Sequence, residues 1–433
     1  MSNGYTREAD GVWYRPGFSG IAYTEGSEIE HRLFDAVSNA SRLETFSPEL
    51  WGQIVDWPSE YHLSRSRHCL VRPLGIKAGD RVLELGCGCG AITRYLGELG
   101  ANVFAVEGTS ARARIAAARC RDLGNVRVFC DDLVAFEADE LFDWALLVGV
   151  LEYAPMFSTL PDPVGHYLTK AGRWLAPQGR LVVAIENKLG LKYFNGCTED
   201  HVGKAFFGIE GLYQRDTPVT FGRKELSDLL RVAEFPAQHW YFPFPDYKLP
   251  TVVLDSSALV CPEFNVADLL LHTESRDYSG QPLRLFNETL AMASLIRNGL
   301  IADLSNSFLV VAQREAAAPA SCEPLAWSFA VHRRPSFATQ TIFVRRETGI
   351  VVVKTAIGLQ GGQEKHDAAQ RITTASGKQA IARVLCSRGG ALKDAPASFP
   401  ARPWRPSSCP GLITCYGTRL SRRTARQSPS AAA

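Results

Sequence analysis

The chain has 433 residues, an apolar fraction of 46% and a formal net charge of +2 at pH 7. A charge so close to zero gives no bulk attraction to nucleic acid or to an acidic membrane surface, so neither is expected as a partner. The sequence has no apolar run near the roughly 20 residues of a transmembrane helix and no signal-peptide pattern at its start, which predicts a cytoplasmic protein. Its 11 cysteines are scattered and odd in number, as expected in a reducing compartment.

Residues 1–50 are expected to form an N-terminal extension. The next stretch, residues 51–74, carries two tryptophans, a tyrosine, His62 and several arginines. We interpret it as a lid or as the flank of a cofactor site, because aromatic faces attract cations. A helix pair packed over the sheet is the alternative. Ser64 is predicted to cap a helix that runs over residues 65–74.

The stretch from Arg81 to Arg94 is predicted to form a buried strand, a glycine turn and the start of a helix. Its apolar run ends at Gly86, Gly88 and Gly90, after which helical spacing resumes. Glycine is needed where the backbone turns tightly and passes close to a ligand, and the amides at the helix start then face that ligand. The pattern is typical of the first β–α unit of a nucleotide-binding α/β fold.

The glycines alone leave the ligand open, because Gly86, Gly88 and Ala91 also fit the dinucleotide fingerprint. Glu84 lies two residues before the first glycine, where its carboxylate would repel the pyrophosphate of NAD. The same carboxylate suits S-adenosylmethionine (SAM), which carries an ammonium and a sulfonium but no phosphate. At this point the sequence resembles the class I SAM-dependent methyltransferases, whose first motif is Glu-x-Gly-x-Gly-x-Gly.

The resemblance implies a Rossmann-like α/β fold with a mostly parallel sheet, an antiparallel final strand and SAM as the cofactor. Glu107, at the end of the second strand, is expected to accept hydrogen bonds from ribose hydroxyls, as it would for NAD. In the family an Asp after the third strand contacts the adenine amino group; Asp132 matches that position and Asp131 is the alternative. The residues expected to bind SAM are Glu84, Gly86, Cys87, Gly88, Gly90, Glu107, Asp132, Leu133 and Val148.

Later strands are expected to bring further polar residues to the same edge of the sheet. Glu152 follows the predicted fourth strand and Glu186 follows the fifth. Family members often carry Glu-His where this chain has Glu152 and Tyr153, which weakens the case for a base at position 153. A polar, glycine-rich insertion over residues 195–222, which contains His201, is predicted to form a lid or a substrate loop.

The sheet is expected to close with an antiparallel pair of strands near residues 239–242 and 251–254. Class I methyltransferase sheets end in this way, whereas a plain dinucleotide-binding fold usually ends on a parallel strand. The pair therefore favours SAM over NAD.

Methyl transfer from a sulfonium is an in-line displacement, and an acceptor hydroxyl needs a base to take its proton. The candidate bases are His62 and Glu186, ranked first, followed by Glu152 and His201. His62 ranks high because imidazole titrates near neutral pH, and Glu186 because it follows a core strand directly. No metal site is expected, since no two Cys/His pairs occur at zinc spacing.

Two phrases, Ile185–Tyr193 and Tyr241–Pro250, resemble a bacterial subfamily found among cell-surface polysaccharide and glycosyltransferase genes. The likeness covers residues 50–312. It implies a methyltransferase that acts on an oxygen or nitrogen of a sugar, a glycan or another small polar acceptor, in association with glycosyltransferase machinery. Two alternatives stay open: an NAD(P)-dependent oxidoreductase, which Glu84 and the closing strand pair disfavour, and a non-catalytic SAM-binding scaffold.

The expected methyltransferase domain spans residues 51–260. Residues 261–312 are expected to form a helical and strand extension that packs on it, and residues 313–325 read as a linker because they are rich in Ala and Pro.

Three short strands are predicted within residues 326–360. Val351 to Lys354 resembles the strand-three lysine motif of kinases, although the kinase glycine loop, His-Arg-Asp and Asp-Phe-Gly are all missing from the sequence. Residues 361–433 are basic and low in complexity, and we interpret them as a disordered or out-of-frame tail that replaces a lost kinase-like domain. A nucleic-acid-binding arm is the alternative.

Overall fold

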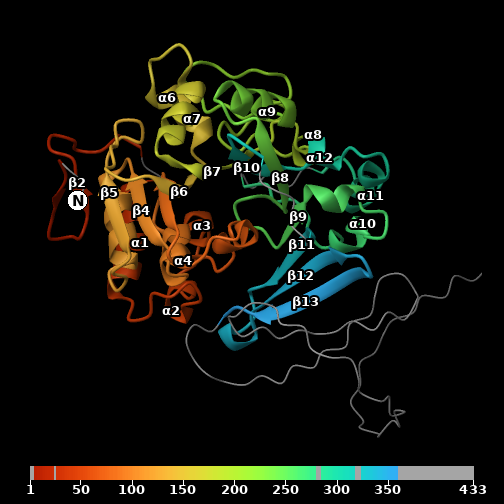
Figure 1. Cartoon of the computed structure of the whole chain (residues 1–433), viewed down its shortest axis with the longest axis horizontal. Helices are drawn as coiled ribbons and strands as arrows, with labels where there is room; N and C mark the ends of the chain where they lie inside the picture. The colour runs from red at the N-terminus through yellow and green to blue at the C-terminus, as the bar shows by residue number, and fades with distance from the viewer. Residues whose placement is uncertain (1–3, 24–25, 279–283, 317–322, 359–433) are drawn as a thin grey trace, which may run out of the picture. The chain divides into compact units, whose positions relative to one another are not determined.

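A computed structural model of the chain describes residues 4–23, 26–278, 284–316 and 323–358. The strands of these residues form one sheet of thirteen, in the order β1-β2-β5-β4-β3-β6-β7-β10-β8-β9-β11-β12-β13 (Figure 1). The predicted tail over residues 361–433 lies outside the described residues, as does much of the predicted linker.

Five parallel strands form the centre of the sheet and run in the order β5-β4-β3-β6-β7. They are β3 (Arg81–Leu85), β4 (Asn102–Glu107), β5 (Val126–Cys130), β6 (Phe142–Val148) and β7 (Leu175–Glu186). Antiparallel strands follow β7 on one side, namely β10 (Ser307–Gln313), β8 (Ala237–Phe244) and β9 (Val252–Asp255). The prediction of a Rossmann-like fold is therefore confirmed, with a parallel central sheet that continues into antiparallel strands.

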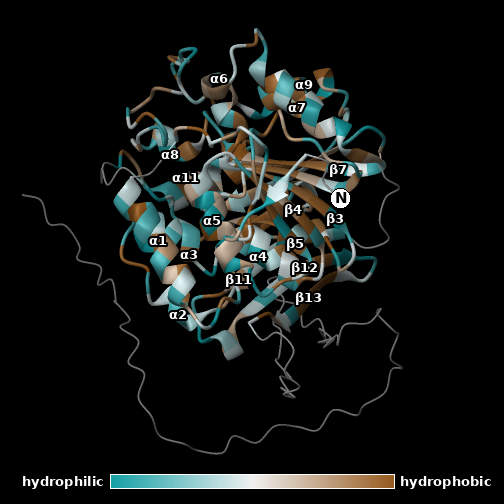
Figure 2. Cartoon of the chain, turned by 90° about the vertical axis from the view of Figure 1, so that its left-hand side faces the viewer, coloured by the Kyte–Doolittle hydropathy of each residue, from teal (hydrophilic) through white to brown (hydrophobic). Residues whose placement is uncertain are grey.

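Helices cover both faces of this sheet. Side chains alternate along a strand, so Leu83 and Leu85 enter one core while Val82 enters the other. Helices α4 and α5 pack on the face of Val82, and α7 and α9 pack on the opposite face. Figure 2 shows the strands as hydrophobic and the outer helix faces as mixed or hydrophilic.

The α-helices are α1 (Ser27–Asn39), α2 (Pro48–Trp51), α3 (Trp57–Leu63), α4 (Ala91–Glu98), α5 (Ser110–Arg119), α6 (Ala154–Phe157), α7 (Pro163–Arg173), α8 (Leu191–Phe194), α9 (Arg223–Val232), α10 (Val266–Leu269), α11 (Glu288–Arg297) and α12 (Ile301–Leu304). Short 3₁₀ turns are η1 (Arg67–Leu70), η2 (Arg72–Leu74), η3 (Leu151–Tyr153), η4 (Ser256–Val260) and η5 (Pro335–Phe337). Among the described residues no helix has both the length and the apolar character needed to cross a bilayer.

The stretch before β3 differs from the prediction. Ser64 does not start a helix; it ends α3, which Asp56 begins with a capping box that includes Ser59. Residues 65–74 contain only the 3₁₀ turns η1 and η2. Pro73 is one physical reason, because proline lacks the amide proton that a continuing helix needs.

The largest difference concerns β10. Residues 261–312 were expected to form an extension packed on the domain, but β10 lies inside the core sheet, hydrogen-bonded to β7 and to β8. The expected strand pair, β8 with β9, does form. The expected domain boundary at residue 260 thus divides the core sheet, because β10 lies after it in the chain and its partners β7 and β8 lie before it.

Strands at the two ends of the sheet complete it. A short hairpin of β1 (Thr6–Arg7) and β2 (Trp13–Tyr14) joins β5 through β2. At the other end β11 (Glu323–Ala330), β12 (Thr339–Arg346) and β13 (Gly349–Ala356) form an antiparallel meander. Because β11 pairs with β9, these three predicted strands continue the sheet.

Candidate active site

The glycine turn between β3 and α4 forms a tight cradle. Gly86, Gly88 and Gly90 have φ values of 76°, 55° and 75°, a left-handed region that favours glycine. A Cβ on Gly86 would lie 2.4 Å from Val150 Cγ2, and one on Gly90 would lie 3.0 Å from Ala116 Cα. Val150 and Ala116 therefore pack against one side of the turn, and the backbone on its other side stays accessible.

Two carboxylates flank this turn. Glu84 is 3% exposed and accepts a hydrogen bond from Thr93 Oγ1 at 2.6 Å. Burial raises the pKa of Glu84 to about 7. Glu107, at the end of β4, accepts hydrogen bonds from Gly88 N at 2.8 Å and Thr109 N at 3.0 Å. Carboxylates at these two positions fit a ligand that carries both positive charge and hydroxyl groups.

A cavity of about 410 Å³ extends from the turn. The predicted SAM-binding residues that line it are Glu84, Gly86, Cys87, Gly88, Glu107, Asp132, Leu133 and Val148. Gly90 does not line the cavity, because it packs against Ala116. Of the two aspartates, only Asp132 reaches the cavity; Asp131 is fully buried, pairs with Arg15 and accepts a hydrogen bond from Tyr5 Oη.

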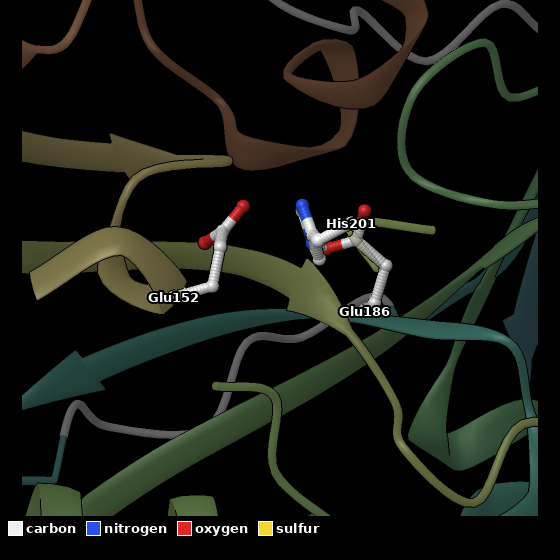
Figure 3. Close-up of side chains that lie close together, drawn as sticks. All are labelled: Glu152, Glu186 and His201. Atoms are coloured by element: carbon white, nitrogen blue, oxygen red, sulfur yellow. Dashed lines mark ion pairs between the residues drawn. The ribbon is translucent and has the colours of Figure 1, made fainter. Parts of the chain in front are cut away.

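Three of the four predicted catalytic residues come together at the carboxyl ends of β6 and β7. Glu152 lies on η3, Glu186 ends β7, and His201 comes from the 195–222 insertion. Figure 3 shows the imidazole of His201 between the two carboxyls. One side-chain donor atom from each residue lies within 4.8 Å of the others, and His201 Nε2 lies 3.5 Å from Glu186 Oε2. Glu152 and His201 line the cavity, and Glu186 lies directly behind His201.

The pKa values in this cluster are strongly shifted. Burial and the charge of Glu186 raise the pKa of Glu152 to about 8. Burial would also raise the pKa of Glu186, but the charges of Lys248 and His201 hold it well below its usual range. Burial would lower the pKa of His201, but the carboxylates of Glu186 and Glu152 raise it to about 9.

A buried chain of alternating charges supports the cluster. Lys248 Nζ lies 2.5 Å from Glu186 Oε1 and also pairs with Asp200, and Lys192 Nζ lies 2.8 Å from Asp200 Oδ1. Tyr247 Oη donates to Glu186 Oε1 at 3.2 Å. Because Asp200 belongs to the 195–222 insertion, these contacts tie that insertion to the sheet.

Aromatic rings line the cavity wall that faces the cluster. Trp57 and Tyr61 come from α3, and Tyr278 precedes the undescribed residues 279–283. The ring centroids of Trp57 and Tyr278 lie 4.0 Å apart. The 51–74 stretch therefore does flank the site, as predicted.

His62 lies apart from the acidic cluster. It is 3% exposed and lines the cavity beside the glycine turn, where a Cβ on Gly88 would lie 3.7 Å from His62 Cε1. Its backbone oxygen accepts a hydrogen bond from Arg119 Nη1 at 2.5 Å. The structure thus places His62 on the cofactor side.

Sequence reasoning missed several residues of the site. Lys192, Tyr247 and Lys248 lie inside the two phrases that carry the subfamily resemblance, which could have marked them. No sequence pattern points to Asp200 or Tyr278. Asp200 reaches the cavity only through the fold of the 195–222 insertion, and Tyr278 only through the fold of the segment before residue 279.

Comparison with known proteins identifies the central part of the chain. Residues 83–181 match the family model described as a methyltransferase domain. The chain is 35% identical over 118 residues to the protein-L-isoaspartate O-methyltransferase of Methylorubrum populi, which covers 27% of this chain and 50% of that protein. It is 34% identical over 119 residues to the demethylmenaquinone methyltransferase of Tropheryma whipplei, covering 27% and 46%.

The chain thus spans about half the length of the curated relatives it matches. Among solved structures, it resembles a phosphoethanolamine N-methyltransferase 2 of Haemonchus contortus in complex with SAM, at 16% identity, covering 58% of this chain and 53% of that one, with a TM-score of 0.34. The matched region contains most of β3, the glycine turn, β4, β5 and β6. Residues 83–181 therefore match a methyltransferase domain, and the cradle described above fits SAM.

Proposed function

We propose that this protein is a methyltransferase that moves the methyl group of SAM to a hydroxyl oxygen of a sugar or similar polar acceptor. One observation carries the proposal: a single cavity runs from the glycine turn to the buried Glu152–Glu186–His201 cluster. The proposed cofactor cradle and a group that can take a proton thus line the same cavity.

On the cofactor side the proposal assigns roles that suit the chemistry of each residue. Glu84 offers negative charge to the cationic part of SAM, and Glu107 offers oxygens to ribose hydroxyls. Asp132 and Leu133 hold the adenine. SAM supplies an electrophilic methyl group on a positively charged sulfur.

On the acceptor side the wall combines flat rings with charged groups. The rings of Trp57 and Tyr278 offer apolar faces, while Asp200, Lys248 and His201 offer hydrogen bonds. A sugar has both an apolar C–H face and many hydroxyls, so this mixture suits it. The subfamily phrases support a saccharide acceptor in surface-polysaccharide synthesis, near glycosyltransferases; a nitrogen acceptor is the alternative.

Glu152 is the residue to which we assign proton removal. Its side chain is fully buried, it lines the cavity, and neither carboxyl oxygen has a hydrogen-bond partner among the described residues. A base near the operating pH contributes about 10²–10⁴-fold. Holding the oxygen, the methyl carbon and sulfur in line contributes further, up to roughly 7–11 kcal/mol in favourable cases.

The test is an acceptor screen with nucleotide sugars, free oligosaccharides and small amines, each incubated with the full chain and SAM. Mass spectrometry should find one added methyl group on a saccharide oxygen, with equal release of S-adenosylhomocysteine. The Glu152→Gln variant should give little product under the same conditions. Methylation of amines alone would overturn the oxygen acceptor, and failure to bind S-adenosylhomocysteine would overturn the methyltransferase itself.

A further inference from the structure

We infer that Glu152, Glu186 and His201 form a site for a divalent cation such as Mn²⁺ or Zn²⁺, which binds and activates the acceptor oxygen. This inference rests on the proposed function and deepens it. It departs from the sequence-based expectation that the chain has no metal site, which looked for ligands at fixed spacing. These three ligands are separated by 34 and 15 residues and meet only in the fold.

The first observation is a set of buried polar atoms that make no hydrogen bond. Both carboxyl oxygens of Glu152 are buried without a hydrogen-bond partner among the described residues. Oε2 of Glu186 and Nε2 of His201 are likewise buried and make no hydrogen bond there, although they face each other as an ion pair at 3.5 Å. Leaving such atoms unsatisfied costs roughly 1–3 kcal/mol each, and more for charged groups. One donor atom from each residue lies within 4.8 Å of the other two, and Figure 3 shows the three side chains side by side, so a single cation between them would contact all three residues.

The second observation is that the outer atoms of two ligands are already held. His201 Nδ1 lies 3.2 Å from Tyr153 Oη. In the tautomer that donates Nδ1–H to this oxygen, the Nε2 lone pair is directed at the cluster. Glu186 Oε1 accepts from Tyr247 Oη and lies against Lys248, which leaves Oε2 as the inner oxygen. Metal-binding histidines and carboxylates are commonly oriented by partners of this kind.

The charge of the surroundings also suits a cation. A bound cation would displace the protons of His201 and Glu152, and three buried carboxylates (Glu152, Glu186 and Asp200) would then face the two ammonium groups of Lys192 and Lys248. Glu199, buried beside His201, adds to the negative excess. A divalent cation offsets this excess; a proton on His201 is the alternative counter-charge, and the experiment below separates the two.

The ligand set indicates which metals to try. Two carboxylates and one imidazole, with positions open toward a cavity, suit Mn²⁺ or Zn²⁺. The donor atoms lie within 4.8 Å of one another. Ligand bonds of about 2.1 Å at a tetrahedral angle place two donors about 3.4 Å apart, so the outermost pair must approach by up to about 1.4 Å, which side-chain rotation can supply.

The cation would activate the acceptor before the methyl group is transferred. The acceptor hydroxyl binds the cation, which lowers the pKa of that hydroxyl, and its proton passes to the Glu152 oxygen that does not bind the metal. The acceptor oxygen then forms a bond to the methyl carbon. The carbon–sulfur bond breaks, and its electron pair stays on sulfur, which becomes a neutral thioether.

The test uses the metal alone and does not depend on methyl transfer. The full chain is treated with a chelator, dialysed, and titrated with MnCl₂ while free Mn²⁺ is followed by electron paramagnetic resonance; ZnCl₂ is titrated in a calorimeter. We expect one Mn²⁺ per chain, and an affinity at least 30-fold weaker in Glu152→Gln, Glu186→Gln and His201→Ala. The matched control is Glu288→Gln, a buried glutamate on α11 that does not line the cavity and should keep full affinity.

Each outcome decides the matter. If the wild-type chain binds S-adenosylhomocysteine but neither metal, a proton and not a cation offsets the negative charge of the cluster. The inference then fails, while the proposed function stands. If the Mn²⁺ affinity is the same in all variants, the metal binds elsewhere and the inference also fails. Because Glu186→Gln removes the charge that pairs with Lys248, the melting temperature and S-adenosylhomocysteine affinity of every variant are measured first. Glu152→Gln, whose carboxyl has no hydrogen-bond partner among the described residues, then serves as the deciding variant.

Discussion

Glu152 and Glu186 follow neighbouring parallel strands and approach the same imidazole, yet their pKa values move in opposite directions. Burial dominates for Glu152, whereas the positive charges of Lys248 and His201 prevail for Glu186. Carboxyls that differ in this way commonly divide the work of a site. Glu186 is anchored by its partners, and for this reason we assign the action on the acceptor to Glu152.

Replacing Glu152 by glutamine tests this division. The change keeps the shape of the side chain but removes its ability to accept a proton, so turnover should fall about 100-fold. Affinity for SAM should stay within threefold of the wild type, because the cluster lies beyond the glycine turn. Turnover is measured as S-adenosylhomocysteine release, and affinity by calorimetry.

The control for that experiment is Glu288→Gln, which makes the same chemical change at a buried site away from the cavity. Its turnover should stay close to that of the wild type. Equal losses in the two variants would mean that Glu152 acts only through stability.

The glycine turn gives a second prediction. Gly86→Ala places a Cβ 2.4 Å from Val150 Cγ2 at a φ of 76°, so the turn must shift and SAM affinity should fall at least tenfold. Gly79→Ala is the matched control, since Gly79 has a φ of 87° but no atom within 4 Å of its Cβ position. That variant should lose roughly 1–2 kcal/mol of stability from backbone strain and keep its affinity for SAM.

The neighbouring aspartates give a third prediction. Asp132 Oδ1 accepts hydrogen bonds from the amides of Val134 and Ala135, so Asp132→Asn can keep this cap while it loses an acceptor toward adenine. SAM affinity should fall about fivefold to tenfold, as for one lost hydrogen bond. Asp131→Ala should instead lower the unfolding free energy by about 1–3 kcal/mol with little effect on SAM. Reversed results would assign the adenine contact to Asp131.

Cofactor affinity should also depend on pH through Glu84. Its pKa is raised to about 7 by burial, with Glu107 raising it and Arg67 lowering it. Below that value Glu84 is protonated and loses its attraction for a cationic ligand, so SAM binding should weaken by about tenfold from pH 8 to pH 6. Glu84→Gln removes this titration, and the difference between the two proteins isolates it from the titration of SAM itself. Parallel pH profiles for both proteins would exclude this role for Glu84.

The sequence predicts the local structure around the glycine turn well because local patterns determine it. An apolar run, three glycines and Glu84 are contiguous, and the third strand expected before Asp131 and Asp132 occurs as β5. Strand, turn and helix start obey rules that act over a few residues. The residues predicted to bind SAM, apart from Gly90, therefore line one cavity.

The acceptor half could not be predicted in the same way. His201 and Asp200 reach the cluster through the fold of the 195–222 insertion, and loops lack the periodicity that fixes direction. His62, ranked first together with Glu186 because imidazole titrates near neutral pH, lines the cavity beside Gly88, and no local pattern gives its distance from the acidic cluster. Nothing local to His201 indicates that two buried carboxylates surround it.

The place of β10 in the sheet was missed for a related reason. Phe308 to Ala312 is apolar at every position, which is typical of a strand buried on both faces. That run could have marked β10 as a core strand. Its insertion between β7 and β8, however, depends on pairing across more than 60 residues of chain, which no local pattern specifies.

The most direct test of the central claim is calorimetric titration of the full chain with S-adenosylhomocysteine and, separately, with NADH. The claim is that the cradle beside Glu84 holds SAM in one cavity with the Glu152 cluster. It predicts one S-adenosylhomocysteine bound per chain, a loss of that binding in Gly86→Ala, and no heat from NADH. Binding of NADH, with no measurable binding of S-adenosylhomocysteine, would contradict the claim.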